Sequence, residues 1–173
     1  FRVMPIRTFR VNVVPVGPDS RGPWQKGRNA MTVELSAIAY SGILLLLLIL
    51  ISAASNVSAM GQPWGVGNRD DAPSADGFKG RAKRAYMNLL EQLVVFSAIA
   101  IPAHLAGIHS GLTVLAAQLF IAGRVAHAIV YLAGWTFISI RTLVWVVALV
   151  GTFIYAYAVL TSGLLMIAAP AAM

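Results

Sequence analysis

The 173-residue sequence has no cysteine and few charged residues. Without cysteine there can be no disulfide bond, no cysteine-ligated zinc or iron–sulfur site and no cysteine nucleophile, so thiol chemistry would need a thiol brought by a substrate. Charged residues make up 11% of the chain, whereas soluble proteins have about 25%. So few charges cannot cover a water-exposed surface, and the mean hydropathy is +0.77. The composition therefore predicts a membrane protein with several spans.

The net charge of +7 does not indicate nucleic-acid binding, because the charge is unevenly distributed. Six of the 13 basic residues lie in the first 30, together with one acidic residue, Asp19. Four of the eight prolines lie there too. We therefore interpret residues 1–30 as a dispensable basic extension and residues 31–173 as the folded domain. The alternative is that the extension binds anionic lipid headgroups.

Long apolar segments predict four membrane-spanning helices. Each is long enough for the roughly 20 residues that a bilayer requires. The predicted helices cover residues 33–57, 79–105, 112–133 and 140–167. The predicted fold class is an all-α, four-helix transmembrane bundle, and no internal repeat is present. The loop after the first helix is basic, and Arg141 borders the loop after the third, so the positive-inside rule predicts that both loops are cytoplasmic.

Two of the predicted helices carry polar side chains within their apolar segments. The spacing is i, i+4, i+7 in one helix and i, i+3, i+7 in the other, so each set shares one helix face. The sets are Arg84, Asn88 and Glu91 in the second helix, and Arg124, His127 and Tyr131 in the third. Charged groups at bilayer depth are costly and face the bundle interior, where they find partners.

Positive charge exceeds negative charge in these segments. We expect Glu91 to be the buried carboxylate, and it cannot neutralise Arg84, Arg124 and Arg141 together. The excess predicts an anionic ligand or a pocket open to water. The structural alternative is an interhelical ion pair between Glu91 and Arg124, with Asn88 as a hydrogen-bond bridge. Taken singly, His127 is more typical of a core histidine and Tyr131 of an interfacial aromatic.

Other chemistries find little support in the sequence. The three histidines lack the spacing of metal ligands. No G-x-S-x-G motif of a serine hydrolase occurs. A transporter is disfavoured because the chain has no inverted repeat.

Two segments resemble signatures of a known family. The sequence RAYMNLLE at residues 84–91 resembles the R-A-x-x-N-x-x-E signature of the second helix in the MAPEG family, the membrane-associated proteins in eicosanoid and glutathione metabolism. Residues 123–132 are similar to the third helix of its prostaglandin E synthase branch, and Arg141-Thr142 to the pair that opens the fourth helix. Residues 67–70 are similar to a loop of bacterial members. The resemblance covers about residues 33–165.

The resemblance implies a homotrimer in the bacterial cell membrane that uses glutathione as co-substrate, without a metal. It implies that glutathione lies between subunits near the cytoplasmic helix ends. The implied glutathione-binding residues are Arg84, Asn88, Glu91, Arg124, His127 and Tyr131. The implied catalytic residues are Arg141, which would favour the thiolate, and Thr142 as its helper. The expected partners are the lipid bilayer, glutathione and a lipophilic small molecule.

The expected activity is that of a glutathione transferase or peroxidase, as in the microsomal glutathione transferase and prostaglandin E synthase branch. The thiolate would attack a lipophilic electrophile or reduce a lipid hydroperoxide. Two features depart from the family pattern: Met87 replaces a further arginine, and the first helix has no arginine. The alternatives are a protein of the same fold that binds another thiol or a lipid, and a non-catalytic scaffold or accessory subunit.

Overall fold

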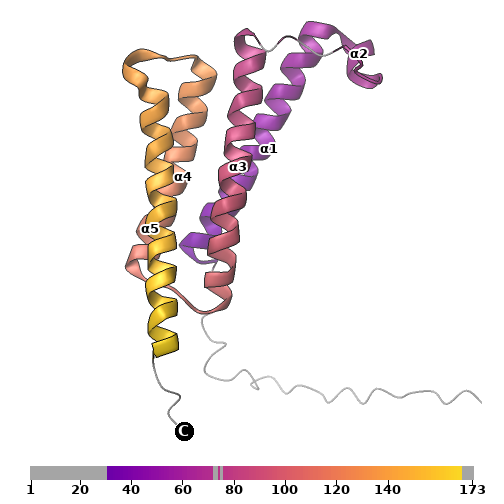
Figure 1. Ribbon diagram of the computed structural model, residues 1–173. Helices are drawn as coiled ribbons and strands as arrows, with labels where there is room; N and C mark the ends of the chain where they lie inside the picture. The colour runs from indigo at the N-terminus through magenta and orange to yellow at the C-terminus, as the bar shows by residue number, and fades with distance from the viewer. Residues whose placement is uncertain (1–30, 72–73, 75, 169–173) are drawn as a thin grey trace, which may run out of the picture. The chain divides into compact units, whose positions relative to one another are not determined.

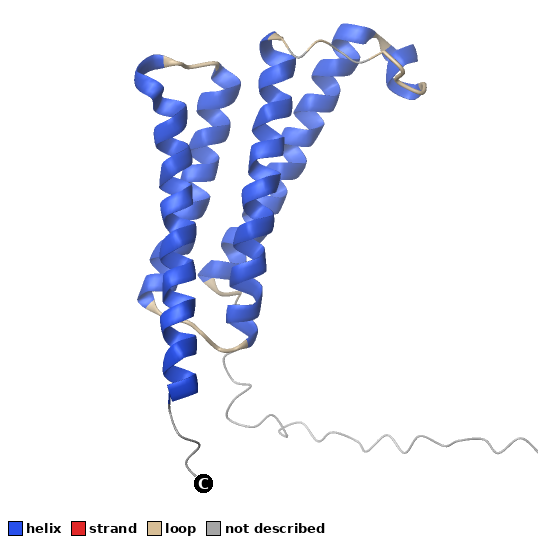
Figure 2. Ribbon diagram, in the orientation of Figure 1, coloured by secondary structure: helices blue, strands red, loops and turns tan. Residues whose placement is uncertain are grey.

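The computed structural model describes residues 31–71, 74 and 76–168. The extension predicted at residues 1–30 lies outside them. The described residues form helices and loops only (Figure 2). The elements are α1 (Val33–Met60), α2 (Gln62–Val66), α3 (Gly77–Leu105), α4 (Gly111–Ala133), the short 3-10 helix η2 (Phe137–Ser139) and α5 (Ile140–Ala168).

Four of these helices are long and apolar enough to cross a membrane, which confirms the predicted fold class: α1, α3, α4 and α5 up to Gly163. The chain is an integral, multi-pass membrane protein. Its helix α1 continues three residues beyond the predicted end at residue 57. The sequence analysis did not anticipate α2, which is short and has Pro63 in its first turn, where a missing N–H costs nothing.

Local sequence explains where the long helices begin and end. Thr32 caps α1 by accepting a hydrogen bond from the backbone N–H of Leu35 at 3.4 Å. At the start of α4, Ser110 and Thr113 form a reciprocal capping box, with distances of 3.2 and 2.9 Å. Gly134 ends α4 in the left-handed conformation, with φ of 76°, which glycine adopts without a Cβ penalty.

The helices form two closely packed pairs, α1 with α3 and α4 with α5 (Figure 1). Small residues allow the close approach of α4 and α5. A Cβ atom on Gly123 would lie 2.6 Å from the backbone nitrogen of Ala148, and one on Gly151 would lie 2.7 Å from the carbonyl oxygen of Ala116. Helices in lipid associate through such close packing, because lipid tails remove the usual hydrophobic driving force.

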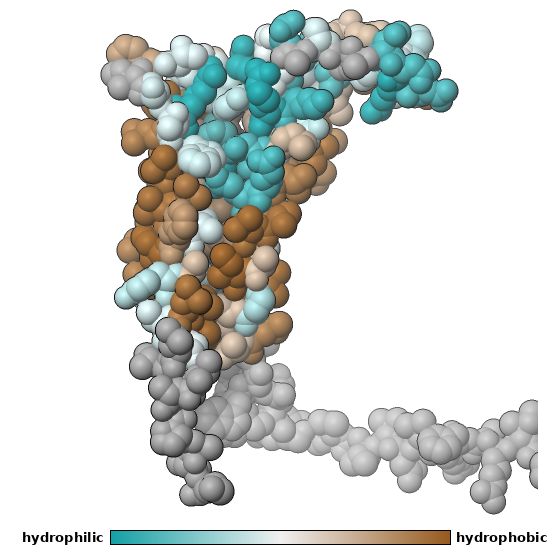
Figure 3. Space-filling model, in the orientation of Figure 1, coloured by the Kyte–Doolittle hydropathy of each residue, from teal (hydrophilic) through white to brown (hydrophobic). Residues whose placement is uncertain are grey.

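An aromatic layer joins the pairs in the core. Phe96 of α3 stacks on Phe120 of α4 with ring centroids 4.1 Å apart, and Tyr155 of α5 meets Phe96 edge-on at 5.3 Å. All three side chains are buried. On the outside, many large apolar side chains are exposed, and Figure 3 shows a hydrophobic surface below a hydrophilic end. The hydrophobic surface suits contact with lipid.

Candidate functional site

The polar residues singled out in the sequence gather toward one end of the helices. This end, here called the α2 end, contains α2, the start of α3, the end of α4 and the start of α5 (Figure 1). The most hydrophilic surface in Figure 3 lies over it. The set of four long helices therefore has one strongly polar end. The predicted site residues lie there, on α3, α4 and α5.

Arg124 is the centre of this set and is almost completely buried, with 1% of its surface exposed. One guanidinium nitrogen, Nη1, donates to Oδ1 of Asn88 at 2.9 Å. The other, Nη2, donates to the backbone carbonyl of Trp145 at 3.5 Å. The side chain of Arg124 thus links α4 to α3 and α5. Its Nε is buried and has no hydrogen-bond partner among the described residues.

The ion pair between Glu91 and Arg124 that the sequence allowed is not formed. An ion pair does occur elsewhere in residues 31–71, 74 and 76–168, between His109 and Glu34. Glu91 is exposed on α3, one turn beyond Asn88, so Asn88 is the residue that reaches Arg124. An amide oxygen satisfies a guanidinium hydrogen but does not neutralise its charge. The positive charge of Arg124 therefore has no carboxylate counterpart in the described part of the chain.

His127 and Tyr131 continue the same face of α4 toward the α2 end. His127 is buried, with 5% exposure, and its ring centroid lies 5.1 Å from that of Tyr131. The guanidinium carbon of Arg141 lies 5.0 Å from the centre of the Tyr131 ring, within the range of a cation–π contact. The Nε of Arg141 donates to the carbonyl of Trp135 at 2.9 Å. These two contacts orient the Arg141 guanidinium.

The predicted residues divide by exposure. Arg84, Glu91 and Thr142 are exposed, and Asn88, Tyr131 and Arg141 are half-buried. A ligand can reach these six side chains from outside the chain. Arg124 and His127 lie behind them and are closed to a ligand in this conformation. The arrangement is a cationic surface backed by a buried guanidinium, which suits an anionic molecule.

The sequence analysis did not single out Arg81, which lies in the first turns of α3 at the α2 end. Its Nε donates to the carbonyl of Leu132 at 3.4 Å. A Cβ atom on Gly134 would lie 3.1 Å from its guanidinium carbon. Arg81 therefore ties the start of α3 to the end of α4. The sequence signal was weak, because Arg81 belongs to a run of basic residues that resembles a solvated loop.

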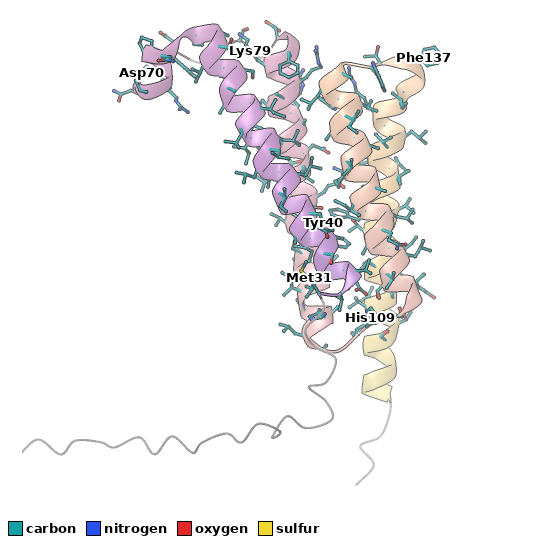
Figure 4. The ribbon with its side chains drawn as sticks, turned by 180° about the vertical axis from the view of Figure 1, so that it is seen from behind. Met31, Tyr40, Asp70, Lys79, His109 and Phe137 are labelled. Carbon is teal, nitrogen blue, oxygen red and sulfur yellow. The ribbon has the colours of Figure 1, made fainter. Side chains whose placement is uncertain are left out.

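The buried carboxylate was also predicted wrongly. It is Glu34, with 2% exposure, and not the exposed Glu91. Its Oε1 accepts a hydrogen bond from the hydroxyl of Thr113 at 2.7 Å and lies 2.8 Å from Nδ1 of His109. Figure 4 places His109 at the end of the helices opposite Lys79 and Phe137. A usable signal was the spacing of Glu34, Ala37 and Ser41 on one face of α1.

Comparison with known proteins agrees with this architecture. The sequence model of the MAPEG family matches residues 37–161, which extend from α1 into α5. No curated protein and no solved structure matches the chain. The matched region contains every residue of the predicted site and most of each membrane-spanning helix. The chain therefore belongs to the MAPEG family.

Proposed function

We propose that the protein is a glutathione-dependent membrane transferase or peroxidase of the bacterial type, related to the microsomal glutathione transferase and prostaglandin E synthase branch. One observation carries the proposal: Arg124 is buried within the candidate membrane span α4 and has only neutral partners, Asn88 and the Trp145 carbonyl. Arginines within membrane spans mark functional sites when no internal counter-ion is present. Glutathione supplies two carboxylates.

The exposed and half-buried side chains of the site are assigned to ligand contact. Arg84 and Asn88 on α3 and Tyr131 on α4 offer a cation, an amide and a phenol to the tripeptide. Glu91 on the same face suits the glutathione ammonium. Arg124 acts from behind by holding the Asn88 amide through the 2.9 Å hydrogen bond and by adding positive potential. His127, packed against Tyr131, positions that ring.

Arg141 is assigned to activation of the thiol. A thiol with a pKa of about 8.5 is mostly protonated at pH 7, and a nearby guanidinium lowers the pKa of a thiol because it stabilises the thiolate. The Trp135 carbonyl and the Tyr131 ring hold Arg141 at the start of α5. Thr142 adds a hydroxyl that can donate to the sulfur.

The thiolate then reacts with a lipophilic partner. In the transferase reaction, the sulfur forms a bond to an electrophilic carbon, and the leaving group departs with the electron pair. In the peroxidase reaction, the sulfur attacks the outer oxygen of a lipid hydroperoxide and forms an S–O bond as the O–O bond breaks. The inner oxygen leaves with the electron pair and is protonated to the lipid alcohol. A second glutathione converts the resulting sulfenic acid to a disulfide and water.

We also propose a homotrimer in the bacterial cell membrane, with the basic α2 end in the cytoplasm. The side chains assigned to ligand contact are exposed or half-buried in a single chain, so a neighbouring subunit would complete the site around the ligand. The cytoplasmic placement follows from the basic residues at this end. Residues 1–30 are proposed to be dispensable for activity.

The test compares wild type, Arg141→Ala and Lys83→Ala, all purified in detergent. Lys83 is an exposed cation at the same end that lies outside the proposed site. Calorimetry measures glutathione binding, and ultraviolet absorbance measures the bound thiolate. We expect binding with a thiolate signal in wild type and Lys83→Ala, and loss of that signal in Arg141→Ala. Absence of binding at millimolar glutathione would refute the proposal and favour another thiol, a lipid or a scaffold role.

A further inference from the structure

A groove of about 730 Å³ separates the last turns of α1 from the start of α3. Its α1 wall contains Ile51, Ala54, Ser55 and Ser58, and the α3 side contains Phe78 and Lys79. None of the residues assigned to glutathione or to thiol activation lines it. The groove is therefore a separate feature of the α2 end, and its role does not depend on the proposed enzymatic function.

The chemistry of the groove changes along its length. Ile51 and Ala54 lie deeper in the α1 span, whereas Ser58 lies near its end. The helical rise from Ile51 to Ser58 is about 10 Å. Lys79 is half-buried, and its Nζ lies 3.4 Å from the hydroxyl of Ser74. An ammonium has three donors, so this contact leaves two for a ligand. A groove that passes from apolar to cationic in this direction matches the acyl chain, glycerol and phosphate of a phospholipid.

Charge selects the kind of phospholipid. The loop after α1 and the first turns of α3 carry five basic residues and three acidic ones within the described residues. The basic residues are Arg69, Lys79, Arg81, Lys83 and Arg84, and the acidic ones are Asp70, Asp71 and Asp76. Lys79 and Asp76 are the charged residues in the groove lining, so the surplus of two positive charges belongs to the surrounding segment, whose field attracts a lipid with a net negative charge. Asp76 lines the groove as well and suits the hydroxyl groups of a glycerol headgroup, which donate hydrogen bonds.

We propose that this groove binds one anionic phospholipid of the phosphatidylglycerol type. Its phosphate lies at Lys79 with the hydroxyl group of Ser58 nearby, and the first part of an acyl chain follows Ile51 and Ala54. Such a lipid joins α1 to α3 at the level where both helices leave the membrane. A ligand that binds the folded state but not the unfolded state stabilises the fold, increasingly as its concentration exceeds the dissociation constant, so the lipid holds the start of α3 against α1.

The experiment uses the full-length protein in nanodiscs or detergent. Native mass spectrometry counts bound lipid, and thermal unfolding is followed with added phosphatidylglycerol, phosphatidylethanolamine or phosphatidylcholine. The variants are Lys79→Gln, which removes the cation, and Ser58→Leu, which fills the groove. Lys83→Gln is the matched control, because it removes a cation from the same helix outside the groove. Glycerol 3-phosphate and inorganic phosphate test whether a soluble phosphate suffices.

We expect wild type and Lys83→Gln to retain phosphatidylglycerol and to be stabilised by it more than by the other two lipids. Lys79→Gln should bind about fivefold more weakly, the factor that one lysine contributes at an anionic surface. Ser58→Leu should weaken binding while remaining folded by circular dichroism. The proposal fails if Lys79→Gln and Lys83→Gln behave alike, if phosphatidylethanolamine binds equally well, or if soluble phosphate reproduces the stabilisation.

Discussion

At the scale of single residues, two buried ionisable side chains organise the opposite ends of the helices. Arg124 has neutral partners only, Asn88 and a backbone carbonyl. Glu34 has one carboxylate oxygen in contact with Thr113 and His109, and its other oxygen, Oε2, is buried without a partner among the described residues. Removing a partner from a buried polar group costs more than the hydrogen bond itself contributes. The effects of substitution should therefore follow burial.

Glu34→Ala tests, at the end opposite α2, whether the loss of stability follows the burial of the substituted side chain. The change removes the acceptor of the buried Thr113 hydroxyl and opens a small cavity, so we expect a loss of about 2–4 kcal/mol in stability. His109→Ala should cost less than Glu34→Ala, because Glu34 keeps the hydrogen bond from Thr113 and 55% of the His109 side chain is already exposed. Denaturant titration in detergent measures both. Equal losses for the two variants would contradict the importance of burial.

At the scale of helices, the approach of α4 to α5 depends on two glycines. A Cβ atom added to Gly123 or to Gly151 would lie less than 3 Å from backbone atoms of the opposite helix. Backbone atoms cannot rotate away as a side-chain tip can. This packing also sets the position of Arg124, which lies one residue after Gly123 and reaches the Trp145 carbonyl of α5.

Gly151→Ala should therefore separate α4 from α5. We expect a destabilisation of about 1–3 kcal/mol from overpacking, read as a lower unfolding midpoint. The matched control is Gly42→Ala in α1, where a Cβ atom meets nothing within 4 Å. Alanine is the better helix former by up to about 1 kcal/mol, so this control should be neutral or slightly stabilising. A stable Gly151→Ala protein would show that the two helices can shift apart without cost.

At the scale of the whole molecule, the ends of the membrane-spanning helices differ in charge. The first turns of α3 contain Lys79, Arg81, Lys83 and Arg84, whereas the connection between α3 and α4 contains no lysine or arginine. Lys and Arg in short loops set orientation during insertion. The topology proposed above can be tested directly because the chain has no cysteine of its own.

Single cysteines at Asn68 and Leu105 should report opposite sides of the membrane. Both positions are exposed, with Leu105 at 81%. In spheroplasts, a membrane-impermeant maleimide should label Leu105→Cys at once and Asn68→Cys only after permeabilisation. The cysteine-free parent is the background control. The reverse pattern would place the basic α2 end outside the cell and overturn the proposed orientation.

The sequence by itself determined the class of the molecule. Apolar segments of bilayer length predict spanning helices because unpaired backbone groups are not tolerated in lipid, and the caps at Thr32 and Ser110 and the stop at Gly134 use local contacts only. The spacing of Arg124, His127 and Tyr131 likewise places them on one face, because that relation lies within one helix. These features needed no knowledge of how the helices pack.

Only the tertiary structure decided which helix partners meet. Asn88 and Glu91 share a face of α3, and spacing alone did not show that Asn88 contacts Arg124 while Glu91 stays exposed. The burial of Glu34 between α1 and α4, and the link from Arg81 to the end of α4, were equally hidden. The reason is that contacts between helices depend on their relative rotation and depth, which close packing of residues such as Gly151 and Ala116 sets.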